Sequence, residues 1–173
     1  MMRNTSKIPV VGITGRSNSG KTTLIERLIP LLKENGFHLA VVKHSHHDLR
    51  FDVPGSDTHR YKKAGAATTI LASPTGIGVV KELEKEISLD EIILRYTDDC
   101  DMVMVEGFKR STIPKIEVFE EQIGEPPLCA DGDGTYVAVV ADNEVAVPLP
   151  RFARDDVNAV AQFIIARFLS GDE

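Results

Sequence analysis

Short apolar runs alternate with stretches that repeat apolar residues at helical spacing. Runs rich in β-branched residues predict strands of a buried parallel sheet. These predicted strands lie at residues 8–13, 38–43, 67–72, 100–106, 113–119 and 136–141. A further run at 77–80 follows the turn 73–76 and is expected to pair back as a small hairpin. Within 113–119, Lys115 and Glu117 alternate with Ile116 and Val118.

Helical spacing of apolar residues predicts three helices between these strands. They run from about Thr23 to Gly36 with Pro30 as an expected bend, from Ser88 to about Tyr96, and from Asp155 or Asp156 to about residue 168. Ser56 or Asp57 is expected to cap a shorter helix that ends near Gly65. The predicted fold is α/β, a mostly parallel sheet flanked by helices with a β-hairpin extension.

Composition narrows the class of protein. The chain has 173 residues, which suits a single domain spanning 1–173, and its net charge of −6 argues against a general nucleic-acid binder. No apolar run is long enough for a membrane span, and no apolar signal core precedes the first predicted strand. Cys100 and Cys129 form no CxxC pair, so both are expected to be reduced thiols. A cytoplasmic protein is therefore expected.

The most informative motif is VVGITGRSNSGKTT at residues 10–23. Gly15, Gly20, Lys21 and Thr22 have the spacing G-x-x-x-x-G-K-[ST], which is the P-loop pattern of phosphate-binding proteins. Glycines let successive backbone N–H groups face one phosphate, the lysine reaches the outer phosphates, and the threonine hydroxyl can ligate Mg²⁺. A predicted strand precedes the motif and a predicted helix follows it, as this interpretation requires.

A predicted strand ending in an acid supplies a second candidate. In the segment CDMVMVEG, Glu106 follows an apolar run and Gly107 permits a sharp turn. An acid in this position holds Mg²⁺ beside a P-loop, directly or through water. The alternative is a core strand with a solvated glutamate at its end. The following Lys109 faces either a phosphate or the solvent.

The segment KHSHHDLRFDVPGSDTHRYKKAGA at residues 43–66 is crowded with polar side chains. Its histidines and carboxylates are His44, His46, His47, Asp48, Asp52, Asp57 and His59. Three interpretations remain open: a transition-metal site, a switch-like loop that brings Asp48 or Asp52 to Mg²⁺ and the attacking water, and a solvated polar loop. Ligand spacing typical of zinc sites is lacking.

The late strand at 136–141 ends in VVAD, with Asp142 as its acid. In GTP-binding proteins a late strand ends in an Asn-Lys-x-Asp segment whose aspartate accepts hydrogen bonds from guanine. The Asn-Lys pair is missing here. Asp142 is therefore a candidate for guanine recognition that is supported by a single acceptor group.

The P-loop, the histidine-rich segment and VEGFK at 105–109, in this order, make the chain resemble the molybdopterin-guanine dinucleotide biosynthesis protein B (MobB) family. The resemblance covers about residues 8–168. It implies a dimeric P-loop protein that binds GTP with Mg²⁺ and assists the guanylyltransferase MobA, which joins GMP to molybdopterin; a contact with molybdopterin itself stays open. Arg16 departs from the residue type usual at its position and is expected to add charge to the phosphate site or to contact a partner.

The resemblance and the motifs together define the expected site. The expected catalytic residues are Lys21, Asp52 and Glu106, and the expected metal ligands are Thr22, Glu106 and Asp52. The expected nucleotide-binding residues are Gly15, Arg16, Ser17, Asn18, Ser19, Gly20, Lys21, Thr22, Thr23 and Asp142. The expected function is a GTP-binding accessory protein with weak GTPase activity in molybdenum cofactor biosynthesis. The alternative is a small-molecule or nucleoside kinase, although the arginine-rich lid common in such kinases is not evident.

Overall fold

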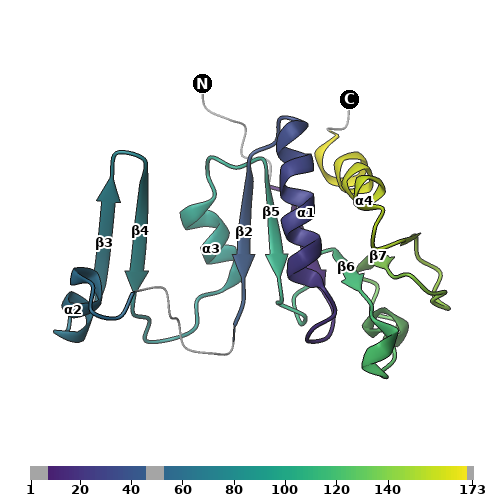
Figure 1. Cartoon of the computed structure of the whole chain (residues 1–173), viewed down its shortest axis with the longest axis horizontal. Helices are drawn as coiled ribbons and strands as arrows, with labels where there is room; N and C mark the ends of the chain where they lie inside the picture. The colour runs from purple at the N-terminus through teal and green to yellow at the C-terminus, as the bar shows by residue number, and fades with distance from the viewer. Residues whose placement is uncertain (1–7, 46–52, 171–173) are drawn as a thin grey trace. The chain divides into compact units, whose positions relative to one another are not determined.

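The computed structural model describes residues 8–45 and 53–170 and divides into two compact units. The first unit comprises residues 1–44 and 95–173, and the second comprises residues 45–94. Each unit has its own sheet, and Figure 1 shows both. The predicted strands are all present, with boundaries shifted by a few residues.

The first unit is built on a six-stranded sheet in the order β2-β5-β1-β6-β7-β8 (Figure 1). Its strands are β1 (Val10–Thr14), β2 (Leu39–Lys43), β5 (Met102–Glu106), β6 (Lys115–Val118), β7 (Tyr136–Val140) and β8 (Arg151–Phe152). Every neighbouring pair is parallel. The carboxyl ends of all six strands therefore lie at one edge, where open α/β sheets bind their ligands. The predicted fold class is confirmed.

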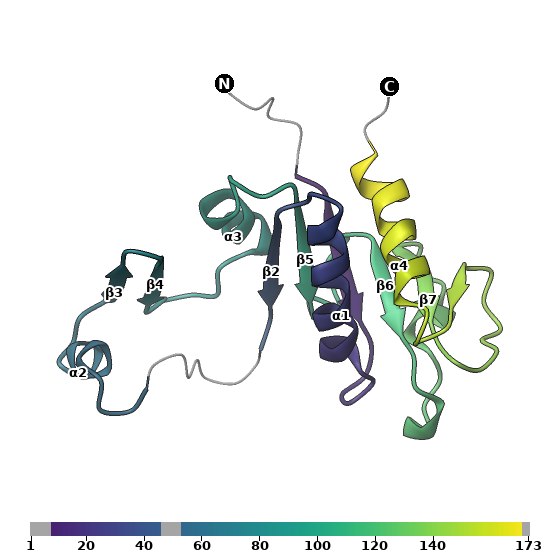
Figure 2. The same cartoon turned by 45° about the horizontal axis from the view of Figure 1, so that its top comes forward.

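Helices α1 (Lys21–Glu34) and α4 (Val157–Ile164) pack against each other, and Figure 2 shows them side by side over the sheet. The π-helical segment η3 (Ile165–Leu169) continues α4. Alternate strand residues face these helices and form the core, namely Val11, Ile13, Met102, Met104, Ile116, Val118, Ala138 and Val140. Helix α1 continues through Pro30, so the predicted bend does not interrupt it. Asp156 caps α4 by accepting from the Ala159 amide.

Lys115 and Glu117 alternate with Ile116 and Val118 as predicted, yet both charged residues are buried. The Lys115 ammonium donates to Thr135 Oγ1 at 2.6 Å and lies 3.2 Å from Asp133 Oδ2. The Glu117 carboxylate accepts from the amides of residues 128 and 129. These partners come from the region predicted as loop, where the short helices η1 (Glu121–Ile123) and η2 (Leu128–Asp131) form. Buried charges are tolerated here because each has found partners.

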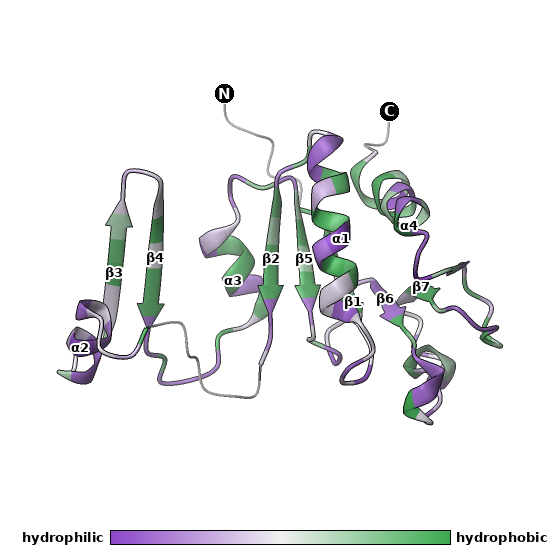
Figure 3. Ribbon diagram, in the orientation of Figure 1, coloured by the Kyte–Doolittle hydropathy of each residue, from purple (hydrophilic) through white to green (hydrophobic). Residues whose placement is uncertain are grey.

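The second unit carries the predicted hairpin. Strands β3 (Thr68–Ser73) and β4 (Gly76–Lys81) pair antiparallel, and Figure 3 colours long parts of both as hydrophobic. Helix α2 (Asp57–Lys63) precedes them with Ser56 as its cap. Helix α3 (Leu89–Tyr96) begins with the predicted capping box between Ser88 and Glu91. Among the described residues, every helix is too short or too polar to cross a bilayer.

Candidate nucleotide-binding site

The loop between β1 and α1 has the backbone of a phosphate cradle. Gly15, Asn18 and Gly20 have positive φ angles of 141°, 62° and 91°. A methyl group on Gly15 would overlap the Val118 carbonyl oxygen and lie 2.6 Å from Ser19 Oγ. Only glycine therefore fits where the loop passes the end of β6. Concave loops of this kind direct backbone N–H groups at an anion, and the N-terminus of α1 adds its positive end.

Lys21 opens α1 and reaches back over the loop. Its ammonium donates to the Arg16 carbonyl oxygen at 2.6 Å. Burial lowers the pKa of Lys21, and the positive charges of Lys109 and Lys43 act in the same direction. The carboxylate of Glu106 opposes them and favours the charged form. Three lysines therefore stand within electrostatic reach of the loop, as a site for a polyanion requires.

Glu106 ends β5 beside Thr22 and Lys43. The Thr22 hydroxyl donates to Glu106 Oε2 at 3.2 Å, and the Lys43 ammonium lies 3.1 Å from Oε1. Hydroxyl and carboxylate oxygens are hard donors, and Mg²⁺ takes one or two protein ligands together with phosphate and water. Thr22 and Glu106 fit that donor set. The described residues contain no cluster of three or more His, Cys, Asp or Glu able to hold a metal ion.

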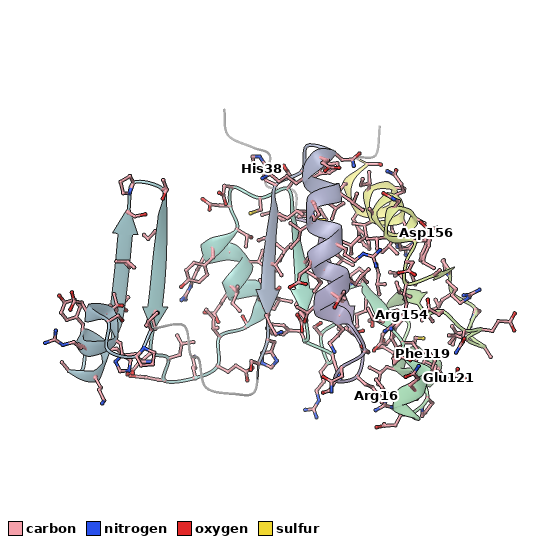
Figure 4. All side chains as sticks on the ribbon, in the orientation of Figure 1. Arg16, His38, Phe119, Glu121, Arg154 and Asp156 are labelled. Atoms are coloured by element: carbon pink, nitrogen blue, oxygen red, sulfur yellow. The ribbon has the colours of Figure 1, made fainter. Side chains whose placement is uncertain are left out.

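The remaining predicted loop residues lie in different surroundings. Ser17, Asn18 and Thr23 are exposed, whereas Ser19 is buried. Arg16, labelled in Figure 4, pairs with Glu125 and donates to the Pro126 carbonyl, so it holds the loop against the segment after η1. This contact within the chain was not expected from the sequence, and the expected contacts of Arg16 with a phosphate or a partner stay predictions.

The predicted polar segment is only partly described. Asp52, His46, His47 and Asp48 lie outside the described residues, so their expected roles stay predictions. His44 is described at the end of β2, where its amide donates to the Glu106 carbonyl at 2.9 Å. Its ring lies 4.5 Å from the Phe108 ring, measured between centroids. Lys109 follows as an exposed side chain.

A pocket opens between the ends of β6 and β7. It is lined by Phe119, Glu120, Glu121, Ala141, Asp142, Asn143 and Arg154. Asp142 is exposed and accepts from the Arg154 amide at 3.1 Å through Oδ1. Figure 4 labels Phe119, Glu121 and Arg154 in this part of the molecule. The sequence-predicted Asp142 thus lies in a pocket rich in carboxylates.

Arg154 is the residue that sequence reasoning missed. Its guanidinium donates to the Ser19 carbonyl and pairs with Glu120 at 2.6 Å. It follows β8, a strand of two residues that is too short to give a hydrophobic pattern. The only available signal was an arginine among polar residues just before the last helix.

Comparison with known proteins identifies the family of the chain. The family model for molybdopterin guanine dinucleotide synthesis protein B, MobB, matches residues 10–142. The chain belongs to the MobB family. This confirms the resemblance drawn from the P-loop, the histidine-rich segment and VEGFK.

Members of the MobB family match most of the chain. The molybdopterin-guanine dinucleotide biosynthesis adapter protein of Haemophilus influenzae is 41% identical over 139 residues, which cover 80% of this chain and 76% of the relative. The adapter protein of Escherichia coli K12 is 35% identical over 167 residues, 95% of each chain. A crystal structure of a molybdopterin-guanine biosynthesis protein B superposes with a TM-score of 0.74 at 32% identity over 91% of this chain and 98% of the other. The crystal structure of Bacillus subtilis MobB superposes with a TM-score of 0.77 at 26% identity over 94% of this chain and 99% of the other.

Proposed function

We propose that this chain is a GTP-binding adapter with weak Mg²⁺-dependent GTPase activity in molybdenum cofactor biosynthesis. The observation that carries the proposal is the meeting of three features at one sheet edge: the positive-φ loop, the Lys21 ammonium and the Thr22–Glu106 pair. The relatives' names, which call them adapter proteins of molybdopterin-guanine dinucleotide biosynthesis, support the pathway. A cytoplasmic location is part of the same proposal.

The phosphates of GTP would bind to the loop from Gly15 to Thr23. Backbone N–H groups and Lys21 would neutralise them, while Thr22 and Glu106 would hold Mg²⁺. When bound, Mg²⁺ offsets charge on the β- and γ-phosphates. Asp52 stays in the proposal as a catalytic and metal residue on the strength of its predicted loop.

The guanine base would enter the pocket between β6 and β7. Asp142 Oδ1 is occupied by the Arg154 amide, which leaves Oδ2 as an acceptor at the pocket. Guanine presents N1–H and N2–H donors to such an acceptor, whereas adenine presents an acceptor at N1. The carboxylates of the pocket therefore favour guanine.

Hydrolysis by the isolated chain should be slow. Among the described arginines near the loop, Arg16 and Arg154 are already paired with carboxylates and carbonyls. The only glutamines are Gln122 and Gln162, the first in η1 and the second on α4. P-loop GTPases that act without a partner protein turn over at about 10⁻⁴ to 10⁻² s⁻¹, and this chain should not exceed that range. Phosphate release from GTP·Mg²⁺, measured with and without a partner, tests this rate.

The proposed partner is a MobA-type guanylyltransferase that joins GMP to molybdopterin. The test is capture of partners on the immobilised chain with GTP·Mg²⁺, followed by identification of the captured protein and any bound pterin. Recovery of the guanylyltransferase and a higher yield of the guanine dinucleotide on adding the chain are expected. ATP-dependent phosphorylation of a small molecule, with no effect on dinucleotide formation, would instead favour the kinase alternative.

A homodimer is proposed through the β3–β4 hairpin. Ile70, Leu71, Ile77 and Val79 are exposed large apolar residues of these two strands. A two-stranded hairpin is marginal alone, and a second copy offers a matching apolar surface. Sedimentation of Ile70→Lys/Ile77→Lys should give a monomer where the wild type gives a dimer. Thr68→Glu, which places a charge at an exposed polar position of the same hairpin opposite Lys81, is the control, and a dimeric double variant would reject this interface.

A further inference from the structure

The Lys43–Glu106 ion pair lies where the proposed nucleotide site needs its metal. Lys43 and Glu106 are paired in register at the carboxyl ends of parallel neighbours β2 and β5. The ammonium lies 3.1 Å from Glu106 Oε1, and Thr22 donates to Oε2 at 3.2 Å. Both carboxylate oxygens are therefore engaged by donors.

The two side chains of the pair differ in their exposure to solvent. The Glu106 side chain is only 12% exposed, whereas the Lys43 side chain is 59% exposed. Glu106 is thus fixed at the strand end, while the flexible lysine can withdraw into solvent or turn toward another anion. Because the lysine of this pair is exposed, water screens the attraction and the ammonium can exchange partners.

A divalent cation on Glu106 needs the same oxygen and repels the ammonium beside it. We propose that Lys43 is a positioning residue that occupies the place of the divalent cation and makes metal binding depend on the nucleotide. Bound phosphates draw the ammonium away from Glu106 and expose the carboxylate to the metal. The inference rests on the proposed nucleotide site and adds to it a residue that couples two ligands.

The coupling has a definite consequence. Without nucleotide, Lys43 competes with the metal, so the free protein binds the cation weakly. With nucleotide, the competition disappears. Because coupling is reciprocal, the same lysine sets how strongly the metal increases nucleotide affinity.

The test uses Mn²⁺ as the probe, because its EPR signal reports the free ion. Mn²⁺ titrations of the full chain without nucleotide compare the wild type, Lys43→Met, Lys43→Arg and Lys33→Met. Lys33 is an exposed lysine in the last turn of α1 and serves as the matched control. We expect Lys43→Met to bind Mn²⁺ at least about fivefold more tightly than the wild type, with the other two variants unchanged.

The same titrations with GTP complete the cycle. With GTP present, the Mn²⁺ affinities of the wild type and Lys43→Met should agree to within about a factor of two. The coupling between Mn²⁺ and GTP binding is then smaller in the variant than in the wild type. Unchanged or weaker Mn²⁺ binding by nucleotide-free Lys43→Met, or no binding by any variant, would overturn the inference. If the wild type does not bind GTP, the proposed function itself is rejected. Thermal unfolding of each variant checks that it is folded.

Discussion

The guanidinium of Arg154 donates a hydrogen bond to the backbone carbonyl of Ser19 inside the phosphate loop. The same side chain pairs with Glu120 at 2.6 Å. The backbone amide of Arg154 donates to Asp142 Oδ1 at 3.1 Å. Arg154 thus connects the loop expected to bind phosphates with the pocket expected to bind the base. Geometry at one end of the site is therefore linked to geometry at the other.

Replacing Arg154 should disturb both ends of the site. Arg154→Gln removes the pair with Glu120 and the donor to Ser19, so the loop loses a charge-assisted anchor worth about 1.5–3 kcal/mol. We expect GTP affinity to fall by roughly five- to tenfold, since part of that loss is recovered by relaxation. Calorimetry with GTP·Mg²⁺ measures it. Arg167→Gln, at an arginine of η3, is the control and should bind GTP as the wild type does.

Gly15 should not tolerate a side chain. Gly15→Ala places a methyl group against the Val118 carbonyl and Ser19 Oγ, on a backbone that already has φ of 141°. Because the loop must shift to relieve this contact, nucleotide affinity should drop by at least about tenfold. Gly76→Ala, at a hairpin position with open space around the added carbon, is the matched control. Equal affinity of both variants for GTP would contradict the cradle geometry.

Asp142 should determine the choice of base. In Asp142→Ala the guanine donors lose a charged acceptor, so the preference for GTP over ATP should fall by about tenfold or more. The Asp142 carboxylate also accepts from the Arg154 backbone amide, so loss of that anchor should weaken GTP and ATP binding alike, and the ratio of the two affinities reports the contact with the base. Competition between GTP and ATP for the nucleotide site measures the ratio of the two affinities. A variant with the wild-type preference would move guanine recognition to other groups.

The sequence predicted the core of the fold because its signals are local. The strand before the P-loop, the capping box at Ser88 and the acid that ends β5 each depend on neighbouring residues. Arg154 and the burial of Lys115 depend instead on residues distant in the chain, such as Ser19 and Asp133. A hydrophobic pattern carries no information about such partners. Lys115 and Glu117 therefore matched an alternating strand, and their burial did not follow from the sequence.

Cys129 should be unreactive in the folded protein. Burial, with the nearby Glu117 carboxylate acting in the same direction, raises the pKa of Cys129 to about 12. At about pH 8 only about one molecule in ten thousand carries the thiolate there, and the reactive fraction grows as pH rises toward the pKa. Alkylation of Cys129 should therefore be very slow at about pH 8 and fast after unfolding. Rapid modification of the native protein would contradict the buried position.

The most direct test of the account is the affinity of the chain for GTP·Mg²⁺ with and without Lys21. The Lys21→Ala variant loses a charge-assisted contact worth about 1.5–3 kcal/mol, so the account predicts GTP binding by the wild type and at least roughly tenfold weaker binding by the variant. Lys33→Ala, an exposed lysine at the far end of α1, should match the wild type. Titration calorimetry gives all three affinities. Equal GTP affinity in wild type and Lys21→Ala, or no binding by the wild type, would contradict the assignment of the loop as a nucleotide site.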